Sequence, residues 1–412
     1  MSNLQNTSKT FVDKIVQHCL NLYNKLPKTG KPTEDEWTVL SCVVQHDTEN
    51  DTFDVVSLGT GSKCIGSSKL SPSGDLLNDS HAEVFARRGF LLYLYDNIDS
   101  AIENKQSIFI QENGRFRLKS NISFIFYSSQ LPCGDGSIFS KNADEECFGD
   151  ILSKKREAQG NVCDGIIKKQ KLESDIYRTG AKCLPDSEQD PKEAGRNYHL
   201  VAQVRTKPGR GDRTLSVSCS DKIAKWIHLG IQGRLLDMCL INPIYISSFI
   251  FGGGVPYSEE SLKRAFLHRN SVSDLLIKYT PKFYQSSVIF HHIKTEHRLR
   301  PASGSIVWIK SENQTLEVAV QGKKLGVTKK AAKSLTKSLC ISKYNIYQRF
   351  QNHLHKNKMI KENIFNNDPV DIPYNQMKAK ATRYEKSWLN VKQKLFKTWT
   401  VKPDIWNFCV ST

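Results

Sequence analysis

Strand-sized apolar runs alternate with segments of helical periodicity along this chain of 412 residues. The densest apolar runs are Ile122 to Tyr127 and Ile244 to Phe251, and each has the length of a buried strand. From residue 76 to residue 95, apolar side chains instead recur every three or four positions, which predicts a helix that begins near His81. The alternation therefore predicts an α/β fold, with a mixed sheet covered by helices.

Other segments fit the same architecture. Residues 11–26 place their apolar side chains on one stripe of a helix, which Pro27 and Gly30 would end. Polar, turn-forming residues separate pairs of β-rich runs, which predicts hairpins. The other predicted elements are hairpins over 38–44 with 52–58 and over 305–310 with 315–320, strands at 215–218 and 246–251, and helices at 219–236, 258–269, 329–357 and 374–399.

The chain carries a large excess of positive charge. Its 59 lysines and arginines exceed its 42 acidic residues by 17, and the sequence pI is about 9.3. Polyanions are therefore the expected partners. A hydrophobic content of 39% excludes a disordered polycation, and no run approaches the length of a membrane span.

The cysteine pattern predicts a reducing compartment, either cytoplasm or nucleus. The 11 cysteines are odd in number and scattered without any C-x-x-C pair, and the N-terminus MSNLQNTSKT has no apolar signal-peptide core. Most of these cysteines are expected to be small buried hydrophobic residues.

Residues 141–197 differ in composition from the rest, with few large apolar residues and many charges. We expect a surface insertion, largely flexible, within a single domain that spans residues 1–412 and has its core from about 11 to 410. Two basic clusters in the insertion, Lys154 to Arg156 and Lys168 to Lys171, match a bipartite nuclear signal, although a solvated charged loop is the simpler explanation.

Three potential metal ligands fall at predicted helix starts: His81, Cys133 and Cys219. A helix N-terminus lowers the pKa of a thiol and favours the thiolate that metals require. One imidazole and two thiolates leave a fourth position open on zinc, which is the catalytic pattern. Glu83 would be a nearby carboxylate that is not a ligand. The alternative is that His81 is a residue of a helix cap and that both cysteines are core thiols.

This layout is similar to that of the zinc nucleobase deaminases, with one departure. Their second signature is P-C-x-x-C, whereas Pro132-Cys133-Gly134-Asp135-Gly136 has no second cysteine nearby. A distant third ligand is needed, and Cys219 is the best candidate because of its position at a helix start. Cys147 and Cys163 lie in the insertion.

At these residues the chain closely resembles the adenosine-to-inosine RNA deaminase domain, which is shared by the adenosine deaminases acting on RNA and the tRNA-specific adenosine deaminase 1 family. The fold that this resemblance implies is a cytidine-deaminase-like mixed sheet flanked by helices, with extra C-terminal helices closing over a buried polyanion. The matching blocks are SLGTGSKCIG (57–66), LLNDSHAEVFARRGF (76–90), SSQLPCGDGSIF (128–139), IYRTGAKC (176–183), RTKPGRGDRTLSVSCSDKIAKW (205–226) and GIQGRLL (230–236).

The resemblance implies a hydrolytic reaction on RNA. Zinc would be held by His81, Cys133 and Cys219, zinc-bound hydroxide would attack C6 of adenosine, and Glu83 would be the proton shuttle. IYRTGAKC and RTKPGRGD are similar to the tRNA branch of the family, which implies inosine formation immediately 3′ of the anticodon (position 37) of alanine tRNA.

Two alternatives to that reaction stay open. One is editing of mRNA or duplex RNA, which the lack of space for double-stranded RNA-binding domains disfavours. The other is a non-catalytic RNA-binding protein with the same fold. No membrane association and no protein partner are indicated by the sequence.

The C-terminal helix predicted at 374–399 places two lysines on an aromatic face. The lysines could reach water along that face, or the face could close over an anion. The resemblance implies the second, because the RNA-editing relatives bury inositol hexakisphosphate there. The residues implied to contact it here are Asn78, Arg87, Arg88, Lys222, Lys225, Lys343, Tyr374, Lys378, Trp388, Lys392, Trp399 and Lys402.

Several positions depart from the family pattern. Lys225 stands where the editing enzymes have arginine, Arg234 replaces a serine, and Val401 replaces a glutamate. The register near the C-terminal helix favours Trp388 over Tyr384 as an aromatic contact.

Polar and basic residues near the motif blocks are candidates for two further roles, a relay and RNA contacts. The resemblance implies a polar relay through Asp79 and Lys207 between the inositol phosphate and zinc. Candidate RNA contacts are basic residues that are flanked by glycine and close in sequence to the motif blocks, although simple surface solvation is a serious alternative. They are Lys63, Arg205, Arg210 and Arg213.

Overall fold

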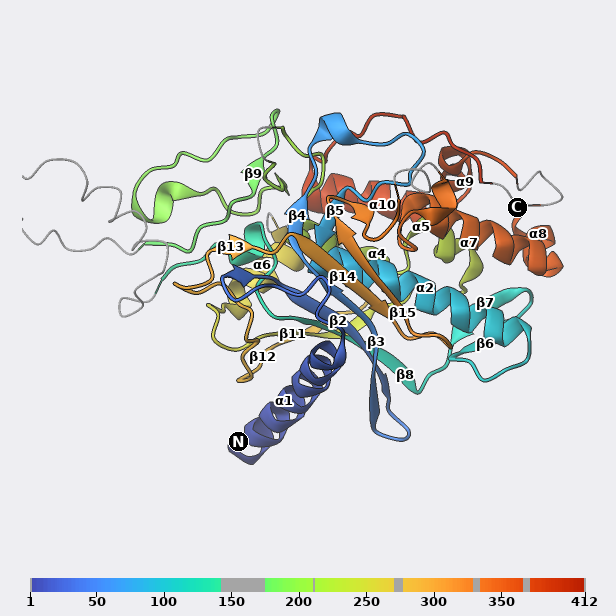
Figure 1. Cartoon of the computed structure of the whole chain (residues 1–412), viewed down its shortest axis with the longest axis horizontal. Coiled ribbons are helices and arrows are strands. Elements are labelled where there is room, and N and C mark those ends of the chain that lie inside the picture. The colour runs from blue at the N-terminus through green and yellow to red at the C-terminus, as the bar shows by residue number, and fades with distance from the viewer. Residues whose placement is uncertain are drawn as a thin grey trace, which may run out of the picture.

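A mixed eight-stranded sheet forms the centre of the molecule (Figure 1). The computed structural model describes residues 2–141, 175–209, 212–269, 277–328, 334–365 and 371–410. In spatial order the strands are β12 (Lys282–Gln285), β11 (Ile246–Phe251), β8 (Ile122–Ser128), β2 (Leu40–Asp47), β3 (Thr52–Thr60), β14 (Gly304–Ile309), β15 (Thr315–Val320) and β16 (Lys323–Lys324). The predicted mixed α/β architecture is confirmed.

The sheet combines a parallel side with an antiparallel side. β8, β11 and β12 run parallel to one another, whereas β2, β3, β14, β15 and β16 pair antiparallel. Both predicted hairpins form, β2 with β3 and β14 with β15. β8 ends at Ser128 and leads directly into the loop that contains Cys133.

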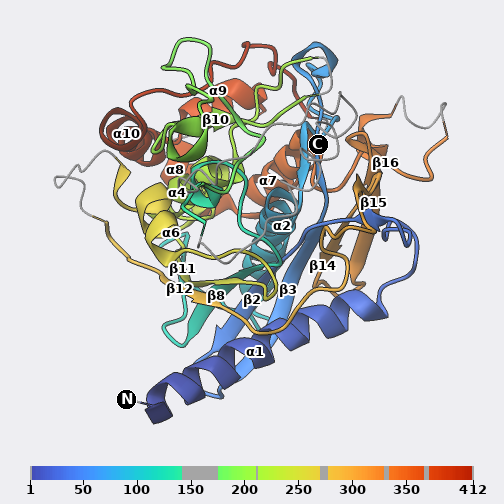
Figure 2. The same cartoon turned by 90° about the vertical axis from the view of Figure 1, so that its left-hand side faces the viewer.

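Apolar side chains alternate between the two faces of the sheet, as the period of a strand requires. In β2, Cys42 and Val44 join the core beneath α1 (Ser2–Lys25), while Val43 joins the core on the opposite face. Figure 2 shows α1 crossing one face alone, with α2, α4, α6 and α7 on the other. The two cores therefore hold the sheet from both sides.

The helices of the described residues mostly cover the second face. No helix among them is long and apolar enough to cross a lipid bilayer. Besides α1, the helices of the described residues are α2 (Ala82–Ile102), α4 (Cys219–Leu229), α5 (Gly233–Cys239), α6 (Glu259–Phe266), α7 (Lys343–Lys356), α8 (Lys358–Phe365), α9 (Tyr374–Ala379) and α10 (Thr382–Val391).

Helix α2 packs directly onto β3 because glycines allow its backbone to approach. A Cβ atom added at Gly59 would lie 2.4 Å from the backbone nitrogen of Ala86, and one added at Gly89 would lie 2.4 Å from Ser57 Oγ. Ser57 Oγ also donates a hydrogen bond to the Ala86 carbonyl, at 2.7 Å. These contacts fix the position of the helix whose first turn carries Glu83.

Short strand pairs and single turns complete the fold. Across the described ranges, four two-stranded ladders connect the larger elements, and 3-10 turns follow several loops. The ladders are β1 (Glu36–Trp37) with β13 (Arg300–Pro301), β4 (Ser62–Cys64) with β5 (Asp79–His81), β6 (Phe109–Glu112) with β7 (Arg115–Leu118), and β9 (Lys182–Cys183) with β10 (Arg205–Thr206); the 3-10 turns span Ser67–Lys69, Asp135–Ser137, Gly195–Tyr198 and Leu335–Lys337.

The C-terminal region differs from its prediction. The helix expected at 374–399 is divided into α9, α10 and a π-helical turn, Lys392–Phe396. At the start of α10, Arg383 binds this helix to the end of α5. Its Nε contacts Asp237 Oδ2 at 2.9 Å, and its other nitrogens donate to carbonyls at the end of α5. The helix expected from 329 begins at Lys343, and residues 329–333 lie outside the described residues.

Two other expectations meet the structure only in part. The strand predicted at 215–218 is reduced to one bridge between Val217 and Thr206. Most of the insertion, residues 142–174, lies outside the described residues, including both basic clusters. Its last part, 175–197, is described and contains β9 and the Gly195–Tyr198 turn. That residues 1–412 form a single domain stays a prediction.

Candidate metal centre and active site

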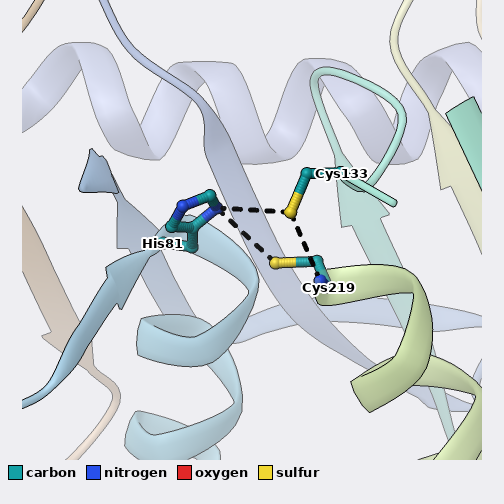
Figure 3. Close-up of side chains that lie close together, drawn as sticks. All are labelled: His81, Cys133 and Cys219. Carbon is teal, nitrogen blue, oxygen red and sulfur yellow. Dashed lines mark hydrogen bonds between the residues drawn. The ribbon is translucent and has the colours of Figure 1, made fainter. Parts of the chain in front are cut away.

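His81, Cys133 and Cys219 come from three separate elements and meet at one point (Figure 3). His81 ends β5 and is the N-cap of α2, and Cys219 is the first residue of α4. Cys133 precedes Gly134, the N-cap of the 3-10 turn Asp135–Ser137. The predicted placement of all three at helix starts is therefore correct.

The three side chains point toward one another with the spacing of a metal site. Their ligand atoms all lie within 4.8 Å of one another. His81 Nδ1 lies 3.6 Å from Cys219 Sγ and 3.9 Å from Cys133 Sγ (Figure 3). Tetrahedral zinc with ordinary bond lengths would separate such nitrogen and sulfur atoms by about 3.6 Å. The donor set therefore fits zinc in both chemistry and spacing.

The two thiols share their contact unequally: it favours the thiolate form of Cys133, whereas burial and the neighbouring Cys133 raise the pKa of the Cys219 thiol well above its ordinary value. The contact with the Cys219 thiol, followed by the charges of Lys207 and His81, lowers the pKa of the Cys133 thiol well below its ordinary value despite its burial. The backbone nitrogen of Cys219 also donates to Cys133 Sγ at 3.3 Å. This is the arrangement expected of a thiol at the start of a helix.

Glu83 is buried beside the centre with part of its carboxylate unused. It is 2% exposed, and its Oε2 atom has no hydrogen-bond partner among the described residues. The charge of Glu83 acts on both Cys219 and Lys207, which places the carboxylate next to the metal ligands. A buried oxygen without a partner is costly, so its place here fits a group that handles protons of water or substrate.

A buried ionic network links the ligands to neighbouring elements. Lys207 Nζ lies 2.9 Å from Asp79 Oδ1 and 3.0 Å from Cys219 Sγ, and Lys222 also pairs with Asp79. The His81 backbone nitrogen donates to Asp79 Oδ1 at 3.1 Å. The structure therefore brings together the residues of the predicted relay, with the metal ligand Cys219 at one end and Lys222 at the other.

The pKa values of the network follow from these pairs. Burial alone would raise the pKa of Asp79, but Lys207 and Lys222 outweigh it and hold the pKa well below its usual range. Burial would likewise lower the pKa of Lys207, but Asp79 and the two thiols raise it well above its ordinary value. Both groups are therefore charged around neutral pH.

The loop of Cys133 is fixed by contacts that the sequence did not reveal. Gly134 has φ 105°, and a Cβ there would lie 2.3 Å from Ser218 Oγ, so another residue would be strained and crowded. The Gly134 nitrogen donates to Thr179 Oγ1 at 3.0 Å, and Ser220 Oγ accepts from Gly136 at 3.1 Å. Thr179 belongs to the insertion, so its described end supports the metal loop.

A second cluster, of basic groups, lies behind the metal centre. In Figure 1, α7, α9 and α10 gather around α2, α4 and α5. Within the described residues, α2, α4, α7, α9 and the segment after the π-helical turn bring together seven basic side chains from distant parts of the sequence, here called the basic cluster. Its members are Arg87, Arg88, Lys222, Lys225, Lys343, Lys378 and Lys402. The positive charges of these groups help to lower the pKa values of Arg88, Lys225, Lys343 and Lys402.

Aromatic rings surround the lysines of this cluster. Lys225 Nζ lies 3.5 Å from the Trp388 ring centroid, 5.5 Å from that of Trp399 and 5.8 Å from that of Tyr384. Lys378 Nζ lies 5.0 Å from the Tyr374 ring. Trp388 is thus nearer than Tyr384, and such contacts offset only part of the cost of bringing cations together.

Mutual repulsion and burial disfavour the charged forms of the cluster. Burial, with the charges of Arg234 and Lys402, lowers the pKa of Lys225 well below its ordinary value. Burial and the charges of Lys402 and Arg88 do the same to the pKa of Lys343. Burial of the ammonium end, with Lys222 and Lys378 nearby, lowers the pKa of Lys402 to about 8. The described residues therefore supply too little negative charge for this site.

Some predicted members of this site have weaker structural support, and others were missed. Asn78 accepts hydrogen bonds through its backbone carbonyl, and Lys392 is half-buried in the π-helical turn. Trp406 was missed, although its ring lies 4.0 Å from Lys343 Nζ. Arg234 was noted only as a departure, and it pairs with Glu385.

The predicted RNA contacts fall in different environments. Arg205 is 0% exposed and donates twice to Asp190, at 2.6 Å each, so the expectation that it lies on the surface is wrong. Lys63 is half-buried on β4, and Arg213 is exposed. Arg210 lies outside the described residues. The Arg205 guanidinium, which was expected to contact RNA, is paired with Asp190 of the insertion.

The geometry and the sequence similarity define the same class. Residues 57–403 match the family model of the adenosine-deaminase (editase) domain. The chain therefore belongs to the adenosine-deaminase (editase) family.

Among curated relatives, tRNA-specific adenosine deaminase 1 of Drosophila melanogaster is 36% identical over 409 residues, which cover 96% of each chain. The human protein of that name is 33% identical, over 95% of this chain and 98% of its own length. The double-stranded RNA-specific adenosine deaminase of Rattus norvegicus is 28% identical over 96% of this chain and 32% of its own length.

We expect the purified protein to contain about one zinc ion per chain, because three donors converge with a fourth position left open. Cys219→Ala removes one donor, so the zinc content measured by plasma mass spectrometry should fall at least about tenfold. Cys239→Ala, which alters a buried thiol of α5 away from the centre, should keep its zinc. Equal zinc in the Cys219→Ala and wild-type proteins would contradict the ligand assignment.

Proposed function

We propose that this chain converts adenosine to inosine in tRNA, at the position immediately 3′ of the anticodon (position 37) of alanine tRNA. The supporting observation is similarity along the full length of relatives whose names specify tRNA, with at least 95% of each chain covered. The double-stranded RNA-specific relative of rat matches over only 32% of its own length. The choice of alanine tRNA and of position 37 comes from the resemblance of the motif blocks.

The side chains of the centre divide the work of a hydrolytic deamination. A zinc ion held by His81, Cys133 and Cys219 would supply a water molecule whose pKa is lowered toward 7. Glu83 accepts the first proton of this water and delivers it to N1 of the base. It then accepts the second proton, from the hydroxyl now on C6, and delivers it to the C6 amino group, which leaves as ammonia. Each transfer needs a carboxylate oxygen that no protein group occupies, and Glu83 Oε2 is such an atom among the described residues.

The depth of the centre explains the choice of a nucleotide in a loop. Glu83 and Cys219 are buried, so the target base must leave its stack and enter the protein. Unstacking costs least where the base is already unpaired, as in an anticodon loop. The net charge of +17 supports binding of the phosphates that flank the base. Residence in the nucleus or the cytoplasm stays a prediction from composition.

We also propose that the basic cluster holds inositol hexakisphosphate. The supporting observation is the mutual lowering of the pKa values of Lys225, Lys343 and Lys402, which lie among cations and aromatic rings. Partly buried cations of like sign destabilise a fold unless an anion compensates them. A compact polyphosphate can contact several ammonium and guanidinium groups at once. Lys222 would then join the polyphosphate to Asp79 and, through Lys207, to Cys219.

Replacing Glu83 by glutamine should abolish the reaction without removing the centre. We expect Glu83→Gln to reduce inosine formation in an alanine tRNA anticodon arm by at least about a hundredfold, since general acid–base groups contribute about 10²–10⁴. Inosine is read as guanosine in complementary DNA. Zinc content and RNA binding should stay close to those of the wild type.

A matched control is available at the other end of the same helix. Glu103 is the C-cap of α2 and pairs with Lys105, so Glu103→Gln should leave the rate unchanged. Full activity of Glu83→Gln would contradict the proton-transfer role. Faster deamination of long duplex RNA than of the tRNA arm would contradict the tRNA assignment.

The polyphosphate can be tested separately from the reaction. Protein from a eukaryotic host should release about six phosphates per chain after denaturation and acid hydrolysis, as one inositol hexakisphosphate would. The double variant Lys343→Met/Lys402→Met should retain less phosphate and have a lower melting temperature. Lys386→Met, an exposed lysine of α10, should match the wild type. Wild-type protein without bound phosphate would refute the assignment.

A further inference from the structure

A cavity of about 470 Å³ lies next to the metal loop and plays no part in the chemistry described above. One wall follows the 3-10 turn after Cys133 and includes Phe139. A second wall consists of the described end of the insertion and the residues that follow it, and includes Arg196 and Val201. The third is α6 with the residues just before it, and includes Tyr257 and Arg264. Its volume is in the range of pockets that hold small ligands.

The cavity is tied rigidly to the metal loop. Phe139 follows Cys133 by six residues, so their backbones lie no more than about 22 Å apart even in a fully extended chain. Asp135 joins the walls: its Oδ1 accepts from the Ala202 nitrogen at 2.7 Å, and its Oδ2 lies 3.3 Å from Arg264 Nε. Another nucleotide of the same RNA loop is therefore within reach when a base is bound at the metal centre.

Two polar groups of the cavity lack protein partners in the described part of the chain. Tyr257 has a buried hydroxyl without a hydrogen bond, and Arg196 is exposed and forms no ion pair there. Arg264 is already engaged by carbonyl oxygens, including that of Ile138 at 2.6 Å. A buried hydroxyl without a partner costs free energy unless a ligand supplies one. The cavity therefore offers the Arg196 guanidinium to an incoming molecule, and the buried Tyr257 hydroxyl in its wall has no protein partner to give up among the described residues.

Apolar surface lies beside these groups. Val201 is 47% exposed, and the half-buried Phe139 ring is held 4.8 Å from the Tyr177 ring. Glu260, at the start of α6, adds one carboxylate to the lining. His199 contributes only ring surface, since Nδ1 contacts Asp190 at 2.9 Å and Nε2 accepts from Thr179 at 3.2 Å. The lining thus combines an aromatic ring, a cation and groups able to bond a base edge.

We propose that this cavity binds a second nucleotide of the RNA, one other than the adenosine that is deaminated. The proposal rests on the proposed function and adds a determinant of substrate choice to it. Arg196 contacts a phosphate of this nucleotide, the base lies against Phe139, and the Tyr257 hydroxyl and the Glu260 carboxylate hydrogen-bond to the base edge. A neighbouring base held in this way would also help keep the loop open.

The test is a double-mutant cycle between protein and RNA. Binding of an alanine tRNA anticodon arm is measured by fluorescence anisotropy on the full chain carrying Glu83→Gln, so that no reaction intervenes. Each loop nucleotide in turn is made abasic, and the series is repeated with Tyr257→Phe and with Arg196→Ala. Tyr257→Phe keeps the ring and removes only the hydroxyl.

One abasic position other than the target should weaken binding to the parent protein by about tenfold, as loss of one stacked base does. That penalty should shrink at least about threefold in Tyr257→Phe and in Arg196→Ala, because they remove partners of the same nucleotide. Arg117→Ala, which alters a half-buried arginine of β7 paired with Glu112, should leave every penalty unchanged.

Equal penalties in the parent and in both cavity variants would overturn the proposal, and so would a uniform loss at all positions. If the cavity instead binds another protein, the abasic penalties are equal in the parent and in both cavity variants. The cycle measures RNA binding alone, whereas inosine formation by the unmodified protein tests the proposed function. Failure of one is therefore distinguishable from failure of the other.

Discussion

The buried contact between Asp79 and Lys207 is the interaction on which both internal sites depend. Lys207 is 1% exposed and lies against Cys219, so its charge would destabilise the interior by several kcal/mol without a matching carboxylate. Asp79 supplies that carboxylate, and it also accepts from the His81 backbone and pairs with Lys222. One side chain therefore orients a metal ligand, neutralises a lysine and reaches the basic cluster.

This network requires elements that are distant in the sequence to be placed accurately. Asp79 lies on β5, Lys207 follows β10, and Lys222 belongs to α4. The close approach of α2 to β3 at Gly59 and Gly89 sets the position of the first element. In the proposed holoprotein, zinc and a polyphosphate lie at opposite ends of the network. Binding of either would then stabilise the geometry that the other needs, because both bind only the folded arrangement.

The sequence predicted the features that depend on local signals. The start of α2 at His81 could be read from helical periodicity, and that of α4 at Cys219 also from the capping residue Ser218, whose side chain accepts from the Asp221 nitrogen. Burial of Arg205 could not, because its partner Asp190 lies in a segment whose composition predicts a flexible insertion. A short, charged segment can still fold when the rest of the protein offers one buried ion pair.

The sequence did not predict the features that form by long-range packing. Trp406 joins the basic cluster only because the chain after α10 returns to Ser71, whose carbonyl accepts from the indole nitrogen at 2.9 Å. The interruption of the C-terminal helix likewise depends on Arg383 and the end of α5, more than 140 residues earlier. The cavity beside the metal loop is formed by three separated segments. None of these contacts leaves a periodic or motif-like signal.

Loss of zinc to a chelator, compared between the wild type and Asp79→Asn, tests most directly whether this network holds the metal centre. Asparagine keeps the size of the side chain and removes its charge. We predict that Asp79→Asn weakens zinc retention by about 10–100-fold, as loss of a group that orients metal ligands does, whereas Asp186→Asn on the exposed surface has no effect. Equal retention by Asp79→Asn and the wild type would contradict the account.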